Sequence, residues 1–309
     1  MSSIHPPRRR LIAGALTMAG ALAALLPALP VAAQAPLRVV ATTPSMGALV
    51  HAVAGDGVLQ ETLVAPGRDA HDLSARPSMI AHLRRADVVV SVGAQLEDGW
   101  LPAALDAAAN PRLRPGQPGH FAVAGQLRLH DTRFDPALGG HVHAEGNPHF
   151  NLAPALMAQA AEALAIRLGA LHPQRAEAFR LRARLFALKL RTRLPQWRAR
   201  LAGPLQALAY HEEFDYFSAW LPVSLVGFIE PKPGVPPSAR HLSELAARHA
   251  GSHGVVLYAD YQPARAPQAL AATLGWPAIA LPLEPLHPTG EAYLALVEQW
   301  VTALAQTTP

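Results

Sequence analysis

The sequence predicts an α/β protein with two lobes, each a parallel sheet flanked by helices, joined by a long linking helix. Short, continuously apolar runs rich in Val, Ala and Leu alternate with runs of helical spacing. This pattern is typical of parallel strands that are buried on both faces. The alternation stops at one long helical run, residues 173–202, and then starts again. A helix of about 30 residues reaches about 45 Å, which is long enough to run along two lobes.

In the first half, we expect strands where apolar runs end in turn residues, and helices where runs have helical spacing. The expected strands cover residues 37–43, 61–65 and 87–92, and the expected helices residues 45–54, 77–85 and 154–170. The linking helix carries arginines along one face, most simply read as a solvated surface. Pro195 is expected to kink or break it.

The second half repeats the alternation. The expected strands are residues 205–210, 224–229, 255–259 and 278–283, and the expected helices are residues 238–250 and 290–305. This divides the chain into an N-terminal lobe over residues 36–172, the linking helix over 173–202 and a C-terminal lobe over 203–309.

The first 35 residues have the features of a secretory signal peptide. Three arginines precede an apolar run from Leu11 to about Leu29, and Ala33-Gln34-Ala35 follows as a cleavage pattern, with cleavage after Ala33 or Ala35. A transmembrane anchor is the alternative, but the run is rich in Ala and Gly and ends in the cleavage pattern. We therefore predict that the protein is exported.

Composition narrows the classes of function. The whole chain has 26 basic and 22 acidic residues, and three of the basic ones lie in the predicted signal peptide. The remaining chain is nearly neutral, so no nucleic-acid partner is expected. The chain has no cysteine, which excludes disulfides and thiolate metal ligands. A metal site must therefore use His, Asp, Glu or water.

Histidines and carboxylates gather where strands are expected to end. The stretch HVHAEGNPHFNLAP contains His141, His143 and His149 on loops, with His149 just before a helix. Ligands of parallel sheets bind outside the carboxyl ends of the strands, and four further residues stand at such ends: His71, His211, Glu230 and Asp260. Each has an ordinary alternative as a solvated or helix-capping residue. If the two sheet edges face each other, His71, His149, His211 and Asp260 converge on one ion.

Five motifs together resemble the periplasmic zinc- and manganese-binding proteins that serve ABC importers, the cluster A-I group with a rigid linking helix. They are PGRDAHDLSARPS at residues 66–78, ADVVVSVGAQLEDGWL at 86–101, GNPHFNLAP at 146–154, AYHEEFDYF at 209–217 and FIEPKPGVPPSARHLSEL at 228–245. The resemblance covers essentially the whole chain after residue 35.

The resemblance implies that His71, His149 and His211 are metal ligands and that Asp260 or a water is the fourth. It also implies a monomer that delivers its metal to an ABC permease in the inner membrane. Three imidazoles and a carboxylate suit Zn²⁺, whereas Mn²⁺ prefers more oxygen ligands. Asn147 replaces the usual Asp before Pro-His and is expected to change outer hydrogen bonds only. No enzyme activity is expected.

Two alternatives share the same site. An exported zinc hydrolase also uses three histidines and an open water position, with Glu212 or Glu230 as the general base. A periplasmic zinc chaperone without a transporter would have the same ligands, and a transport assay distinguishes it.

Overall fold

The computed structural model describes residues 1–3, 35–131 and 143–307. Residues 35–309 form one compact unit, and the description below concerns this unit. The predicted signal peptide falls largely on residues 4–34, and His141 on residues 132–142, so both lie outside the described residues. None of the helices in the described ranges is long and apolar enough to cross a membrane.

The N-terminal sheet has four parallel strands. They are β1 (Leu37–Ala41), β2 (Val58–Thr62), β3 (Val88–Ser91) and β4 (His120–Ala122), and their order across the sheet is β2-β1-β3-β4. In this register Val39 lies opposite Val88. β2 lies on one side of β1 and β3 on the other, so the chain crosses from one half of the sheet to the other after β2. In parallel sheets, ligands bind at such a switch point, outside the carboxyl ends of the strands.

The C-terminal sheet repeats this topology. Its strands are β5 (Leu205–Ala209), β6 (Val223–Phe228), β7 (Val255–Ala259) and β8 (Ala278–Leu281), in the order β6-β5-β7-β8 and all parallel. The fold class predicted from the sequence is confirmed.

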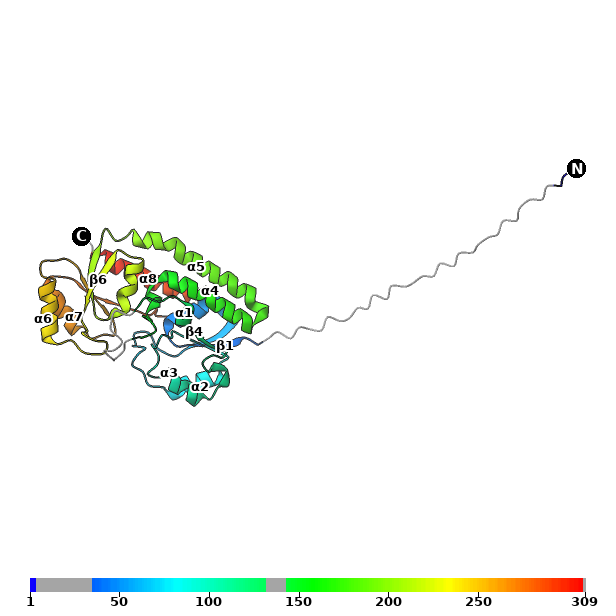
Figure 1. Cartoon of the computed structure of the whole chain (residues 1–309), viewed down its shortest axis with the longest axis horizontal. Coiled ribbons are helices and arrows are strands. Elements are labelled where there is room, and N and C mark those ends of the chain that lie inside the picture. The colour runs from blue at the N-terminus through cyan, green and yellow to red at the C-terminus, as the bar shows by residue number, and fades with distance from the viewer. Residues whose placement is uncertain (4–34, 132–142, 308–309) are drawn as a thin grey trace. The chain divides into compact units, whose positions relative to one another are not determined.

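Helices cover both faces of each sheet (Figure 1). They are α1 (Pro44–Ala54), α2 (Pro77–Arg85), α3 (Leu101–Ala108), α4 (Pro154–Leu171), α5 (Ala176–Arg198), α6 (Ala239–Arg248), α7 (Arg265–Leu274) and α8 (Gly290–Ala305). Helices α2 and α3 pack on one face of the first sheet, and α6 and α7 on one face of the second. The other four helices share a single apolar core with the inner faces of both sheets.

The alternation of side chains along β1 separates these layers. Val39 and Ala41 belong to the shared core, whereas Val40 faces the core under α2 and α3. This period of two is the geometry of a strand buried on both faces. Because the shared core includes Phe217 and Trp300 as well as Val39, the two lobes are held together by one body of apolar contacts.

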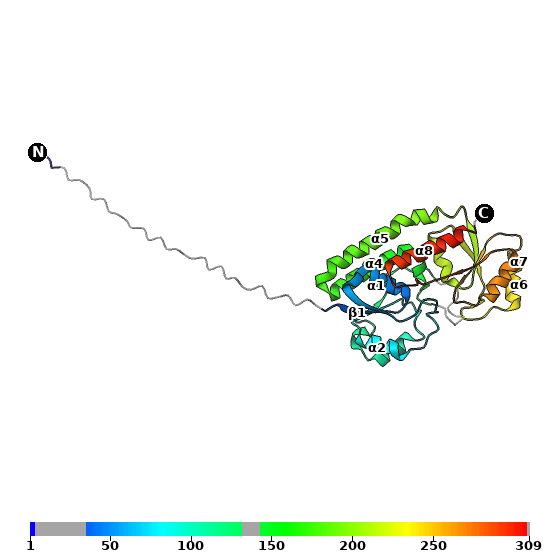
Figure 2. The same cartoon turned by 180° about the vertical axis from the view of Figure 1, so that it is seen from behind.

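The linking helix α5 is shorter than expected and does not end at its proline. It runs from Ala176 to Arg198 and lies beside α4 (Figures 1 and 2). Pro195 stands in the last turn, three residues before the helix ends, so the hydrogen bond that it cannot donate is missing only near the end of the helix. The helix continues through Pro195, and the break that was one of the two expected outcomes does not occur.

Three elements were not expected from the sequence: α3, α7 and the three-residue strand β4. In addition, β2 begins at Val58 rather than at Glu61. Strand β4 is too short to show an alternation of apolar and polar residues. It is identified by its pairing with β3, in which His120 lies opposite Val89.

Glu97 is a buried carboxylate that connects two strands. Its side chain is 3% exposed and accepts hydrogen bonds from Thr42 Oγ1 (2.6 Å), Val92 N (2.7 Å) and Gly93 N (2.9 Å). Burial raises the pKa of this carboxyl, while these three donors oppose the rise. Glu97 thus ties together the carboxyl ends of β1 and β3.

Candidate metal centre

Four imidazoles meet in a single cluster: His71, His143, His149 and His211. One ring nitrogen from each lies within 4.8 Å of those of the others, and the Nε2 atoms of His71 and His143 are 3.1 Å apart. Around a tetrahedral Zn²⁺ with Zn–N bonds of 2.0–2.1 Å, ligand nitrogens are separated by about 3.4 Å. Small side-chain movements would therefore bring the four nitrogens to coordination distance.

The ligand-type side chains come from both lobes. His71 lies in the loop that follows β2, and His211 follows β5 and precedes a 3-10 helix, Glu212–Ala219. His143 and His149 lie in the loop before α4, where His149 begins a short 3-10 turn. His71 and His211 are thus delivered by corresponding edges of the two sheets, as expected for this topology.

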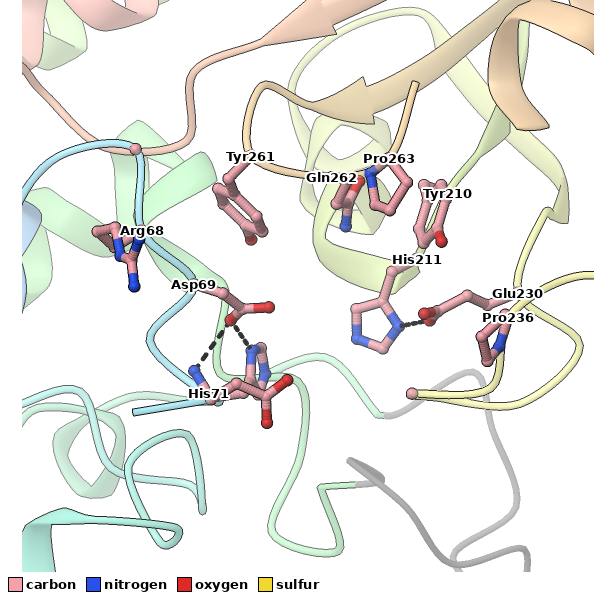
Figure 3. Close-up of a pocket in the computed structure, with 13 residues that line it drawn as sticks. Arg68, Asp69, His71, Tyr210, His211, Glu230, Pro236, Tyr261, Gln262 and Pro263 are labelled. Atoms are coloured by element: carbon pink, nitrogen blue, oxygen red, sulfur yellow. Dashed lines mark hydrogen bonds and ion pairs between the residues drawn. The ribbon is translucent and has the colours of Figure 1, made fainter. Parts of the chain in front are cut away.

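The cluster is withdrawn from solvent at the base of a cleft. The side chains of His71 and His211 are 7% and 8% exposed, and His143 and His149 are buried. The cleft has a volume of about 470 Å³, with Tyr210, Gln262 and Glu230 on the C-terminal side and Asp69 on the N-terminal side (Figure 3).

Three of the imidazoles are oriented by an acceptor on Nδ1. His71 Nδ1 is 2.7 Å from Asp69 Oδ1, and His211 Nδ1 is 3.1 Å from Glu230 Oε2 (Figure 3). In His149, Nδ1 is 2.8 Å from Asn147 Oδ1. In a neutral ring, a proton on Nδ1 leaves the lone pair on Nε2, the nitrogen that can face a metal. His149 Nε2 is buried and has no hydrogen-bond partner among the described residues.

Asn147 also connects the loop before α4 to the C-terminal lobe. Its Nδ2 donates to the Glu212 carbonyl (3.0 Å), and its own carbonyl accepts from Tyr216 Oη (2.7 Å). Tyr216 Oη in turn accepts from His130 N (3.1 Å). The Asn147 side chain therefore has two roles. Its oxygen accepts from His149, and its amide nitrogen connects the loop before α4 to the C-terminal lobe at the site.

Burial and neighbouring charges act on two of the imidazoles in opposite directions. Burial, with the nearby His71, His211 and His143, holds the pKa of His149 well below its usual range, so this ring stays neutral. Burial also acts to lower the pKa of His211, but its hydrogen bond to Glu230 and the charges of Glu213, Glu230 and Glu212 outweigh it and raise the pKa to about 9.

Asp69 has a lowered pKa. Burial acts to raise it, and the hydrogen bond and charge of His71 outweigh that effect. Asp69 and Glu230 therefore place negative charge behind two ligand-type imidazoles, which increases the basicity of their Nε2 atoms.

Of the four ligands expected from the sequence, the structure brings three together and leaves Asp260 outside the cluster. Asp260 is exposed, and its backbone N–H continues the β7–β8 ladder to Leu281 O. The next residues line the cleft instead. Gln262 accepts from Ala259 N (2.7 Å) and donates to Glu213 Oε1 (2.9 Å), which holds this turn against the His211 segment.

His143 is the member of the cluster that sequence reasoning did not select. The sequence placed His143 on a loop and left its role open, yet the residue is 1% exposed and its Nε2 lies 3.1 Å from that of His71. The signal in the sequence was its place in one stretch with two other histidines, six residues before His149. Glu230 was a candidate general base in the sequence, and in the structure its carboxylate lies against His211 Nδ1.

Two α/β lobes with buried imidazoles from both at their facing edges define a metal-binding solute-binding protein. Residues 39–307 match the model of the family described as "ZnuA: Zinc-uptake complex component A periplasmic". The chain belongs to this family.

Individual proteins share the sequence or the fold of this chain. The high-affinity zinc uptake system protein ZnuA of Yersinia pestis is 29% identical over 241 residues, covering 72% of this chain and 75% of that protein. A crystal structure of ZnuA superposes with a TM-score of 0.72 at 19% identity, covering 89% of this chain and all of that one. FpvC of Pseudomonas aeruginosa, solved with Mn²⁺, also gives 0.72 at 19% identity, with 89% and 98% covered.

Proposed function

We propose that this protein captures Zn²⁺ in the periplasm with His71, His143, His149 and His211 and delivers it to an ABC importer. The observation that carries the proposal is the convergence of four imidazole nitrogens within 4.8 Å, contributed by both lobes. Zinc is the transported cargo. Because the ligands come from both lobes, a bound ion would join His71 of the N-terminal lobe to His211 of the C-terminal lobe.

Zn²⁺ is favoured over Mn²⁺ by the chemistry of the ligands. Four imidazoles and no carboxylate match a tetrahedral zinc site, whereas Mn²⁺ prefers oxygen ligands. The curated relative in Yersinia pestis is named for zinc uptake. FpvC was solved with Mn²⁺, so selectivity has to be measured on this chain.

An exported zinc hydrolase is less well supported. A catalytic zinc keeps one coordination position open for water or substrate, and four imidazoles fill all four positions of a tetrahedral site. The candidate base Glu230 already accepts from His211 Nδ1, and the side chain of Glu212 belongs to the buried 3-10 helix after His211.

The organisation predicted from the sequence remains part of this proposal. Residues 1–35 direct export, residues 36–172 and 203–309 form the lobes, and residues 173–202 link them as a monomer. The partner is the permease of an ABC importer in the inner membrane. This rests on the family, whose description places its members in the periplasm and in zinc uptake.

Calorimetric titration of chelator-stripped residues 36–309 with Zn²⁺, with chelator competition for tight binding, tests the ligand set. We expect one tight site, lost in His149→Ala and strongly weakened in His143→Ala. Asp260→Ala is the matched control and should bind like the unmodified protein. Loss of affinity in Asp260→Ala with unchanged binding in His143→Ala would restore the ligand set expected from the sequence and refute this one. A parallel titration with Mn²⁺ should give weaker binding.

Transport separates import from a chaperone role. Cells lacking the gene should grow poorly when zinc is chelated, and a plasmid copy should restore growth and ⁶⁵Zn uptake. His149→Ala should not restore either. A normal uptake rate in the deleted strain, alongside tight zinc binding by the purified protein, would favour a chaperone without a transporter.

A further inference from the structure

The solvent-facing side of α5 carries an apolar stripe that the metal site does not use. Leu181, Leu185 and Leu188 are 55%, 50% and 54% exposed. Their spacing of four and three residues places them on one face of the helix. This stripe lies opposite the buried face, which packs into the shared core through Phe179, Phe186 and other residues.

Basic side chains line both sides of the leucine stripe. At about 100° per residue, Arg180, Arg184 and Arg191 fall on one side of the stripe and Arg182, Lys189 and Arg193 on the other. All six are exposed. Helix α5 has seven basic residues and one acidic residue, although the chain after residue 35 as a whole is nearly neutral. The positive charge of the protein is therefore concentrated along this helix.

Few of these charges are neutralised within the protein. Arg184 and Arg193 make no ion pair with the described residues, and Arg180 has only a wide one, 3.7 Å to Glu177. Lys189 and Arg191 have similarly wide and exposed partners, Glu291 at 3.4 Å and Glu162 at 3.7 Å. Exposed pairs of this kind are readily exchanged for an external anion.

We propose that this face, Leu181, Leu185 and Leu188 with their flanking arginines, binds reversibly to the surface of an anionic phospholipid bilayer. Leucines between long basic side chains suit the membrane interface, where the leucines enter the acyl boundary and the guanidinium groups stay at the phosphates. A convex helical ridge also fits a planar surface without a matching groove.

A second copy of the chain is a poor occupant. Packing two such stripes against each other would bring the arginine rows of both copies together, and like charges at close range oppose association. An acidic protein is the remaining alternative, and protein-free vesicles distinguish it from a membrane.

The test is vesicle co-sedimentation with residues 36–309, which omits the apolar residues 11–29 because these would bind lipid themselves. Vesicles of phosphatidylcholine are compared with vesicles containing about 30% phosphatidylglycerol at low and high salt. We expect binding only to the anionic vesicles, and at least tenfold weaker binding in about 0.5 M NaCl, because screening shortens the reach of each charge.

Two α5 variants and a matched control separate the parts of the surface. R180Q/R184Q/R193Q should lower the partition coefficient at least about tenfold, since each charge near an anionic surface contributes about fivefold. L181Q/L185Q/L188Q should also lower it, and the residual binding should be more sensitive to salt. The control R114Q/R248Q/R265Q removes three exposed charges elsewhere and should bind almost normally.

Circular dichroism and zinc titration confirm that each variant is folded, which is expected because the changed side chains face solvent. An equal loss of vesicle binding in the control and in the α5 variants would overturn the proposal, because binding would then depend on the net charge of the protein and not on this face of α5. Absence of binding to protein-free anionic vesicles would overturn it in favour of an acidic protein partner. A dimer in sedimentation velocity that is lost in the leucine variant would overturn it in favour of self-association.

Discussion

Replacing Glu230 by Gln should change how many protons zinc binding releases. The Glu230 carboxylate lies 3.1 Å from His211 Nδ1 and is one of three acidic groups that raise the pKa of His211 to about 9. In the metal-free protein at neutral pH, His211 therefore carries a proton on each ring nitrogen. Zinc must displace the proton on Nε2 before it can bind there.

The magnitude follows from the pKa. Relative to an ordinary imidazole near 6.5, a pKa of about 9 corresponds to about 3 kcal/mol of proton affinity, so protons compete with zinc at His211 throughout the neutral range. Because the pKa is raised, this competition is strong below about pH 9 and disappears above it. The apparent zinc affinity of the unmodified protein should rise about tenfold from pH 7 to 8 and about fivefold from pH 8 to 9.

The Glu230→Gln variant keeps an acceptor for Nδ1–H, as Asn147 does for His149. It removes the carboxylate of Glu230, whereas Glu213 and Glu212 remain in place. Because the hydrogen bond and charge of Glu230 raise the pKa of His211, the substitution should lower this pKa. With a pKa of about 9, zinc binding at pH 8.5 releases about three-quarters of a proton at His211, and the variant should release less. Weaker ligand basicity should lower the affinity about tenfold at pH 9, whereas near pH 7 the reduced proton competition should offset this loss.

Calorimetry in buffers of different ionisation enthalpy gives the proton count, and chelator competition gives the affinity at each pH. Glu244→Gln on α6, exposed and distant in sequence from the ligands, is the control and should leave both unchanged. An unaltered proton count in Glu230→Gln, or the same loss of affinity at pH 7 and pH 9, would refute the assignment of the proton to His211.

Three further predictions concern other parts of the molecule. Asn147→Ala should weaken zinc binding about 10–100-fold, because the acceptor of His149 Nδ1 and the link to Glu212 O are both lost; competition with a chelator measures this, and an affinity within threefold of normal would contradict it. Burial raises the pKa of Glu284 to about 7 despite its hydrogen bonds from Ser45 and Thr43, so folding stability is lost as pH rises from about 4.5 through 7. In thermal melts of the metal-free protein, Glu284→Gln should therefore raise the Tm more at pH 8 than at pH 5. An equal change at both pH values would exclude this effect. Trp300→Ala should lower the free energy of unfolding by about 3–5 kcal/mol and destabilise both lobes together, since Trp300 lies in the shared core. Urea denaturation followed by probes in each lobe should show a single transition, and independent unfolding of the lobes would argue against one core.

Much of the architecture was accessible from local pattern. The apolar runs at β1, β3, β5 and β7 are long enough and rich enough in Val, Leu and Ala to indicate buried strands, and prolines mark the starts of α2 and α4. Short elements such as β4, with three residues, carry no periodic signal. They become strands because they pair with a neighbouring strand, here β3, which is distant in sequence.

The sequence by itself determined that His71 and His211 each follow a strand at the carboxyl edge of a parallel sheet, where ligands bind. Only the tertiary structure decided that the edges of the two sheets face each other and bring these histidines together. The sequence could not decide between His143 and Asp260. Loop side chains are positioned by contacts between segments distant in sequence: Asn147 with Glu212 draws the His143 loop onto the C-terminal lobe. The β7–β8 ladder and Gln262 leave Asp260 in solvent. Those contacts exist only once both lobes have folded around their shared core.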